Sequence, residues 1–480
     1  PSENTFTQNI FLYNNKTFFD HFLIIKYGDI MKVLIKEYRL SLAFFFLTIL
    51  FTVWSNPTLK PHENGDTPGY VSVAQDFSNT EANDLRSFGY PLLIKIAMVI
   101  DENNWKKSLV LLQIILHGIS IVLINNSLKI LGYHKITSTV VTLLVCIHPA
   151  LLVYSNYLIA ESFLSFLIVL YWYVGIQILK NKSSTNYYYK LMFLGLISSF
   201  SYMVKAVWIL GFSTIIPPLI FFLRKKEKIL YSLIIISFFH FSLPFFWELY
   251  KNKNISIQSN MKYQSMVVNI NFAAIRLGLI EDGRDTELYQ KIRELGLLDK
   301  AKRCNGRDNE DFRAVYHGLD FKDRYDINFT MNILKTSFIP FSFGQLRNIY
   351  RFYSDRMHVP VGATAFYLLR ENLISIFFSG YNAFYRPFLI FFLFIGIFIN
   401  LRKNLNREVY IFNYSILIYF SLVLTIFTIA PVHMIRMRVP LDFLLIIHSI
   451  APLLDHFILS KLGFTTNNHI FKNFRIIRRN

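Results

Sequence analysis

Residues 157–179 read YLIAESFLSFLIVLYWYVGIQIL, an apolar run in which Glu161 is the single charged residue. A helix of this length crosses the roughly 30 Å of hydrocarbon in a bilayer. The whole chain of 480 residues has the same character, with 53% hydrophobic residues, 17% aromatic residues and a mean hydropathy of +0.36. A soluble domain seldom carries so much apolar surface. The sequence therefore predicts an all-α polytopic membrane protein.

Further apolar runs on both sides of this segment are long enough to be membrane spans. Ten candidates result: 38–55, 108–128, 136–154, 157–179, 191–204, 206–223, 229–247, 381–400, 409–429 and 439–459. The fifth and sixth are short and nearly continuous, so they could be one bent pair or a re-entrant unit. We predict a transmembrane bundle of about ten helices.

The positive charges give the bundle an orientation. The formal net charge is +19, and clusters of Lys and Arg occupy the short loops at 180–190, 224–228 and 402–407 and the tail at 472–479. With ten spans, all of these clusters fall on the side of the N-terminus. Lys and Arg collect on cytoplasmic loops, so both termini are predicted in the cytoplasm and the protein in the inner or plasma membrane. Because the basic residues lie in short loops, nucleic acid is not an expected partner.

This topology divides the chain into five regions. They are a cytoplasmic N-terminal segment (1–37), helices one to seven with the first external loop 56–107 (38–247), a large and mostly helical extracytoplasmic region (248–380), helices eight to ten (381–459), and a basic cytoplasmic tail (460–480). The aromatic stretch 338–353 in the large region suits an interfacial helix at the level of the lipid headgroups.

The first external loop carries the most informative pattern. Residues 65–77 read GDTPGYVSVAQDF, and residues 86–93 read RSFGYPLL. Gly65 and the Pro68-Gly69 pair interrupt regular structure around Asp66, and a short helix follows. Asp66 would lie at the helix N-terminus, where backbone N–H groups keep a carboxylate ionised. The alternative is a helix-capping aspartate without a chemical role.

This loop resembles that of the GT-C superfamily of polytopic glycosyltransferases. The superfamily includes the protein O-mannosyltransferases, the lipid A aminoarabinose transferase and the RgtA/B/C/D-like group. The matching residues are, in order, Asp66, Tyr70, Ala74, Arg86 and the cluster Gly89-Tyr90-Pro91 that enters the second span. Phe88 stands where the family often has proline.

The resemblance implies a GT-C-type bundle and an inverting glycosyltransferase. The donor would be a sugar on a polyprenyl phosphate, and the acceptor a glycan, a lipid or a protein on the extracytoplasmic side. Asp66 would be the general base for the acceptor hydroxyl. Arg86 would hold the donor phosphate, because a guanidinium matches phosphate geometry and keeps its charge. The alternative for Arg86 is an interfacial arginine that reaches toward the headgroups.

Other candidates lie farther along the chain. Glu161, at the external start of the fourth span, is a second acidic or acceptor-binding candidate, and its alternative is a first-turn acid favoured by the helix dipole. The last external loop, residues 430–441, reads APVHMIRMRVPL and resembles the Arg-Tyr-x-x-Pro type of ending of the family. Arg436 and Arg438 are expected to contact phosphate, with Lys205 as a weaker candidate. Tyr70, Asp76 and His433 complete the acceptor-side candidates.

No cofactor is required by this interpretation. A divalent metal ion stays open, because Asp66 and Glu161 could serve with or without one. A polysaccharide polymerase or ligase that uses a diphosphate-linked glycan is the alternative within enzymes. A transporter or flippase is the alternative from another class, and it would show charged groups near the midplane and repeat symmetry. A non-catalytic scaffold is a third alternative.

Overall fold

A computed structural model gives the structure of the protein. It describes residues 39–54, 56, 58–77, 87–181, 186–223, 226–254, 261–304, 310–345, 391–399, 407–427 and 439–461. Every named element in these ranges is a helix, and the extended backbone forms one isolated bridge, between His62 and Tyr157. The all-α fold class predicted from the sequence is confirmed.

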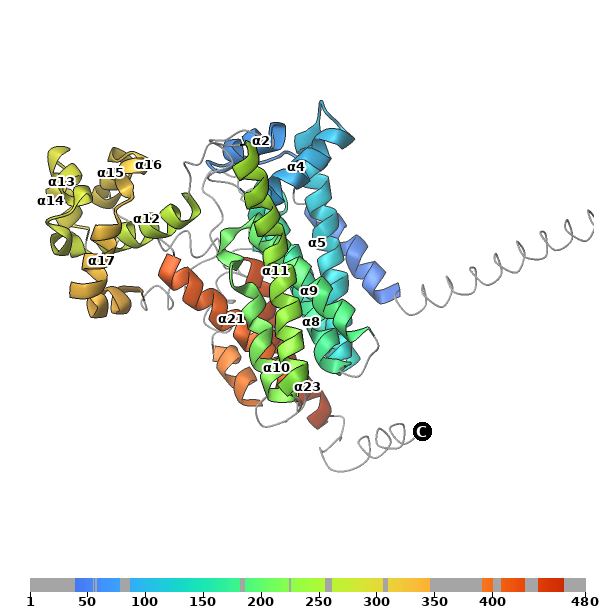
Figure 1. Cartoon of the computed structure of the whole chain (residues 1–480). Helices are drawn as coiled ribbons and strands as arrows, with labels where there is room; N and C mark the ends of the chain where they lie inside the picture. Colours follow the sequence, from blue (N-terminus) through green and yellow to red (C-terminus); the bar gives the residue numbers. More distant parts are fainter. Residues whose placement is uncertain are drawn as a thin grey trace, which may run out of the picture.

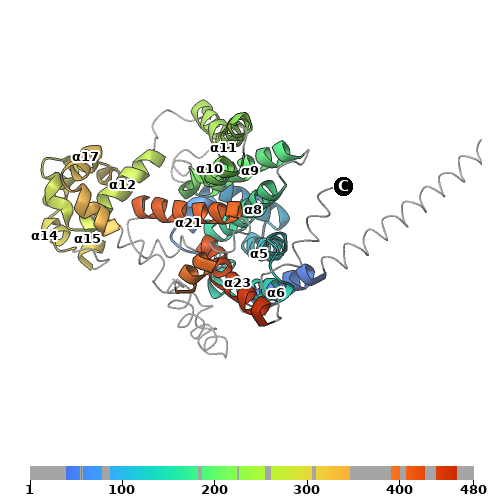
Figure 2. The same cartoon turned by 90° about the horizontal axis from the view of Figure 1, so that it is seen from below.

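A bundle of long helices forms the larger part of the molecule (Figures 1 and 2). Its elements are the helix Arg39–Trp54, α2 Thr67–Gln75, α4 Gly89–Ile100, α5 Trp105–Ile130, α6 Lys135–Cys146, α7 Pro149–Tyr154, α8 Ala160–Lys180, α9 Tyr187–Val204, η1 Ala206–Trp208, η2 Gly211–Ile215, α10 Ile216–Phe222, α11 Lys226–Asn254, α21 Arg407–Phe427, η4 Val439–Leu441 and α23 Asp442–Lys461.

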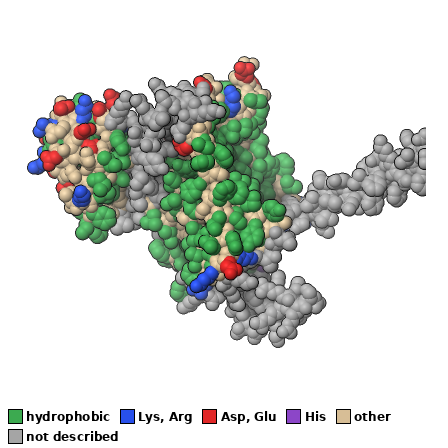
Figure 3. Space-filling view, in the orientation of Figure 1, with side chains coloured by type: hydrophobic (Ala, Val, Ile, Leu, Met, Phe, Trp, Pro, Cys, Tyr) green, Lys and Arg blue, Asp and Glu red, His purple; other side chains and the backbone are tan. Residues whose placement is uncertain are grey.

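Four helical segments are long and apolar enough to cross a membrane. They are Trp105–Ile130, Ala160–Lys180, Lys226–Tyr250 and Val439–Ile458. In Figure 3 hydrophobic side chains cover the middle of the bundle, and charged side chains gather toward its ends. The chain is an all-α polytopic membrane protein, because such a surface is stable only where lipid replaces water.

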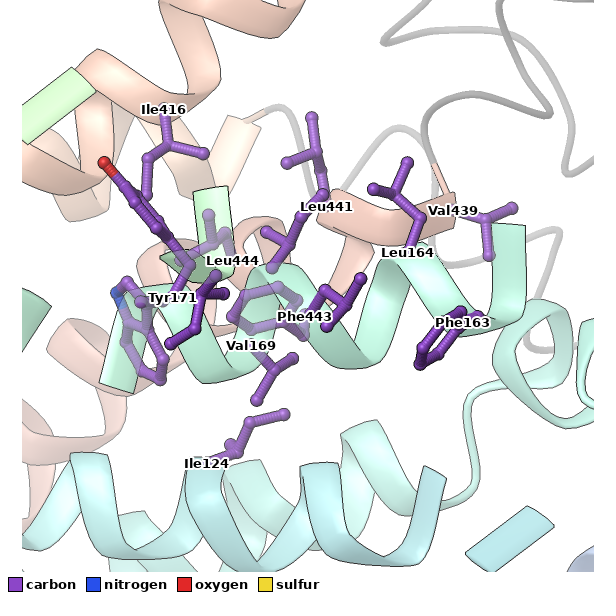
Figure 4. Packing of buried hydrophobic residues seen from close by; sticks show 14 of the residues in the cluster. Ile124, Phe163, Leu164, Val169, Tyr171, Ile416, Val439, Leu441, Phe443 and Leu444 are labelled. Carbon is purple, nitrogen blue, oxygen red and sulfur yellow. The ribbon is translucent and has the colours of Figure 1, made fainter. Parts of the chain in front are cut away.

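Helix α8 lies inside the bundle and α11 lies on its surface. In the most apolar window of each helix, 67% of α8 is buried but only 17% of α11. α8 packs against α5, α9 and η4, and Figure 4 shows its side chains between Ile124 of α5 and the segment Val439–Leu444. α11 packs on α9 and carries exposed phenylalanines on its other face, such as Phe238 at 67%. That face suits contact with lipid tails.

Two of the predicted spans are not continuous helices. The expected span 136–154 is divided into α6 and α7, with a break before Pro149, which occupies the first turn of α7. Proline has no N–H to donate and its ring clashes with the preceding turn, so the helix cannot continue through it. The apolar composition predicted that this segment is helical and apolar, but it did not predict the break between α6 and α7.

The expected span 206–223 is also interrupted. α9 ends at Val204, and two 3-10 turns precede α10, whose first turn contains Pro217. Buried side chains satisfy the irregular backbone: His240 Nε2 lies 2.7 Å from Ile209 O, and Tyr419 OH accepts from Leu210 N at 3.0 Å. Non-helical backbone at membrane depth is tolerated only where the protein provides such partners. The fifth and sixth candidates are thus two helices with an irregular link.

The loops gather at two opposite ends of the bundle. At one end Tyr133 OH and Tyr410 OH lie 3.2 Å apart, His134 N donates to Asp455 Oδ1 at 2.9 Å, and Lys228 Nζ lies 4.3 Å from the ring centroid of Tyr187. The first external loop lies at the other end, with α2 and α4 (Figure 1). The two sets of loops thus lie apart along the bundle, and the placement of both termini in the cytoplasm stays a prediction.

A second, smaller helical unit follows α11. It consists of α12 Met261–Arg276, η3 Leu279–Gly283, α13 Glu287–Glu294, α14 Leu298–Lys302, α15 Glu310–Gly318, α16 Phe321–Arg324 and α17 Ile327–Thr336. This unit has its own hydrophobic core, in which Phe272, Ile292 and Phe329 are fully buried. It falls within the segment 248–380 that the sequence predicts as extracytoplasmic and mostly helical.

Candidate functional site

Hydrogen bonds tie the first loop to the segment that precedes α8. His62 N donates to Asn156 O at 3.1 Å, and Leu158 N donates to His62 O at 2.9 Å. Asn56 Nδ2 donates to Asn156 Oδ1 at 3.0 Å. These contacts join residues about one hundred positions apart in sequence, so they fix the loop against the start of α8.

Asp66 occupies the N-cap position of α2, as the sequence predicts, but its side chain makes no capping hydrogen bond. Thr67 and Asn64 instead organise this turn: Thr67 Oγ1 donates to Leu158 O at 3.0 Å and accepts from Asn64 N at 3.0 Å. Asp66 is therefore next to a residue that anchors the loop on the α8 side. Because the side chain does not cap the helix, local capping does not account for an aspartate here.

Tyr70 and Tyr90 join α2 to α4 and α5. Their rings meet edge to face, with centroids 5.0 Å apart, and both side chains are buried. Tyr90 OH donates to Gln113 Oε1 at 3.0 Å, and Gln113 Nε2 donates to Ser155 O and Tyr157 O at 3.0 and 2.8 Å. Gln113 thus links three segments at this end of the bundle. Gln113 was not among the residues predicted from the sequence, although an amide within the apolar run 108–128 is a usable signal.

The start of α4 lies against the end of α9. A Cβ on Gly89 would stand 2.6 Å from the carbonyl carbon of Met203 and 2.6 Å from Val204 N. Only glycine permits such a close backbone approach. The contact brings the chain just after Arg86 to the point where α9 ends, one residue before Lys205. The cluster 89–91 lies at the start of a separate helix, α4. The apolar helix that corresponds to the predicted second span is α5, which begins at Trp105.

Glu161 and Lys205 form an ion pair at this same place. Lys205 Nζ lies 2.5 Å from Glu161 Oε1, with the Glu161 side chain fully buried and the Lys205 side chain 13% exposed. Glu161 is in the first turn of α8, and Lys205 follows the last residue of α9. The sequence named both residues as site candidates but did not pair them. Two buried charges are stable at a membrane edge only when they compensate each other.

His62 adds a titratable group to the loop junction. Its imidazole is buried against Tyr157, with ring centroids 5.2 Å apart. Burial, together with the nearby charge of Lys60, lowers the pKa of His62 below its usual value of about 6.5. The neutral imidazole of His62 is thus the form favoured when the first external loop is bonded to the segment before α8.

The other predicted residues divide into two groups. Asp76 is exposed and stands at the C-cap of α2, about 15 Å along the helix from Asp66. Arg86, His433, Arg436 and Arg438 lie outside the described residues. The described chain resumes at Val439, which is buried, and η4 packs on α8 near Phe163 and Leu164 (Figure 4).

Other polar groups lie beside this set. His148 and Asp442 are both fully buried, with Nε2 and Oδ2 3.7 Å apart, and neither was predicted as a site residue. A cavity between α5, α7 and α8 is lined by His117, Tyr154 and Ser165, among others, and it contains none of the predicted residues. In the described ranges, no three His, Cys, Asp or Glu side chains come close enough to hold a metal ion.

No protein-family model and no curated protein matches the chain. Among solved structures, the chain is similar to an archaeal oligosaccharyltransferase, AglB from Archaeoglobus fulgidus, in complex with an inhibitory peptide and a dolichol-phosphate. The sequence identity is 13% and the TM-score 0.44, over 92% of this chain and 54% of that one. The chain thus spans about half the length of that enzyme.

Proposed function

We propose that the chain is an inverting glycosyltransferase. It would move a sugar from a polyprenyl-phosphate donor to a glycan, lipid or protein acceptor at the extracytoplasmic face. The observation that carries the proposal is the junction at one end of the bundle, where the loop with Asp66 is bonded to the segment just before Glu161, and Glu161 is paired with Lys205. A half-buried carboxylate on a loop that is bonded to the segment before a buried ion pair suits a reaction of a hydroxyl with a lipid-borne phosphoester.

Asp66 is the proposed general base, and its position supports this role. The carboxylate is half-buried at the N-terminus of α2, where the helix dipole favours a negatively charged side chain. The phosphate is a good leaving group, so the base is the main group that the protein must supply. Arg86, Arg436 and Arg438 are the proposed phosphate contacts, and Lys205 would contribute positive charge beside them.

Glu161 has a different proposed role. Because its carboxylate is fully buried against Lys205, it would fix the ammonium group in place, and its burial makes it less suited to proton exchange with an acceptor. Tyr70 would hold α2 in register through Tyr90. We keep Asp76 and His433 as acceptor-side candidates.

The experiment separates the base from the phosphate contact. Asp66→Asn keeps the side-chain volume but cannot accept a proton, so turnover should fall by about 10²–10⁴-fold while the lipid donor still binds. Arg86→Ala should weaken donor binding by about 1.5–3 kcal/mol, and Arg86→Lys should restore only part of it, since ammonium lacks the bidentate fork. Purified variants in nanodiscs would be titrated with a polyprenyl-phosphate sugar.

Glu63→Gln is the matched control, because Glu63 lies in the same loop, is exposed and pairs with Lys106 at the surface. Its turnover should stay close to that of the wild type. Near-normal turnover of Asp66→Asn at saturating donor would refute the base assignment. Activity that instead requires a diphosphate-linked glycan would favour a polymerase or ligase.

A further inference from the structure

Helix α17, in the smaller helical unit, has an apolar face that the described residues of the unit leave exposed. Phe329, Thr330 and Ile333 point into the core of the unit and are buried. On another side of the helix, the spacing i, i+4, i+7 aligns Ile327, Met331 and Leu334 into one stripe. These side chains are 52%, 46% and 37% exposed, and Phe338, which follows the end of α17, is 59% exposed. A soluble surface rarely keeps such a stripe in water.

The stripe continues past the end of α17. Residues 338–345 are again helical, and Ile339 and Phe343 are 66% and 69% exposed. Lys335 is the only charged residue between 327 and 345. The segment therefore combines large exposed apolar groups with almost no charge, a combination that water opposes and a lipid interface favours.

Apart from Lys335, charged residues of the unit lie on other elements. Helix α13 buries Leu288 and Ile292, while Arg293 and Glu294 are exposed, and Glu281 of η3 is paired with Lys302 of α14. In Figure 3 the charged side chains of this unit spread over the side away from the bundle and the upper side, and hydrophobic side chains gather on its lower side, where Figure 1 places α17. The unit is amphipathic as a whole.

The chain keeps this unit close to the bilayer. α11, a helix apolar enough to cross a membrane, ends at Asn254, and the unit begins at Met261. The intervening residues can span at most about 25 Å even when fully extended. The last turns of α11 lie at the end of the bundle that carries α2 and the start of α4, here called the site end. Trp247 of α11 packs there on Phe88, with ring centroids 5.0 Å apart. The link from α11 therefore keeps the apolar stripe close to the bilayer, and the bilayer is an apolar surface that can cover it.

We propose that the face formed by Ile327, Met331, Leu334, Phe338, Ile339 and Phe343 docks on the lipid bilayer at the site end of the bundle. The face lies in the membrane interface, with its apolar side chains about 5–10 Å into the boundary between headgroups and acyl chains. Docking holds the smaller unit at a fixed height relative to the bilayer. It is independent of the reaction that the site performs.

The test is a depth measurement on the full-length protein in phosphatidylcholine nanodiscs. An environment-sensitive fluorophore is attached to Met331→Cys, and the same fluorophore on Glu294→Cys of α13 is the matched control. The natural cysteines, Cys146 and Cys304, are buried, and the unsubstituted chain measures their background labelling. Doxyl groups on the lipid acyl chains quench a probe that lies within the interface.

At position 331 we expect a blue-shifted emission and strong loss of fluorescence with doxyl lipids, and at position 294 neither effect. Phe338→Asp should reduce the quenching at 331 while the circular dichroism spectrum stays unchanged. Equal exposure of both probes to an aqueous quencher would overturn the proposal. A probe at 331 that is shielded from water but untouched by doxyl lipids would overturn it as well, because a second copy of the chain or another protein would then cover the face.

Discussion

The ion pair between Glu161 and Lys205 gives the sharpest prediction about the bundle. Removing one member of a buried pair typically costs about 3–5 kcal/mol, because the other charge stays in a medium of low polarity. The two members are not equivalent here, since the Glu161 side chain is fully buried and the Lys205 side chain is 13% exposed. After loss of Glu161, the long lysine side chain can reach toward water. After loss of Lys205, the carboxylate has no such path.

We therefore expect Lys205→Met to destabilise the protein by about 3–5 kcal/mol, and Glu161→Leu by less, about 1–3 kcal/mol. The double variant should be close to wild type in stability, because an apolar pair of similar volume often replaces a buried ion pair without loss. The unfolding free energy would be measured by steric trapping in bicelles, and the four proteins form a double-mutant cycle.

The exposed pair Lys106–Glu63, with side chains 43% and 47% exposed, is the control. Such pairs contribute about 0–1 kcal/mol, so Lys106→Met should change little. The reasoning would be refuted if the losses in Lys205→Met and Glu161→Leu matched that control and simply added in the double variant. The buried charges would then not depend on each other.

Three further predictions concern the junction of the loops. Gly89→Ala should reduce stability and activity together, because the new Cβ would clash with the backbone at the end of α9. Gly65→Ala is the control and should be tolerated, because its Cβ would have nothing within 4 Å. Thermal unfolding and turnover are measured for both variants. Gln113→Leu should cost about 1–3 kcal/mol for each buried partner it abandons, Tyr90 OH among them, measured by the same steric trapping. Burial lowers the pKa of His62, so the unfolded chain binds this proton more readily than the folded chain. The free energy of unfolding should therefore fall as the pH drops below about 6.5. His62→Asn should flatten that part of the pH profile of unfolding.

The sequence predicted the class of the fold because its signal is local. A run such as 157–179 is apolar over the full width of a bilayer, and no tertiary contact is needed to recognise it. The helix breaks were less accessible. Pro149 and Pro217 mark them, but apolar composition across the breaks is unchanged, and irregular backbone there depends on partners such as His240 and Tyr419 from distant helices.

The sequence by itself determined the membrane class, the helical architecture and a list of candidate residues, because residue type and spacing are written along the chain. Only the tertiary structure decided which candidates meet. Glu161 and Lys205 are 44 positions apart, and Gln113 joins segments from three parts of the chain, so neither arrangement has a local signature. The physical reason is that the energy of a buried polar group is set by its partners across the bundle, which only the packing of the helices brings together.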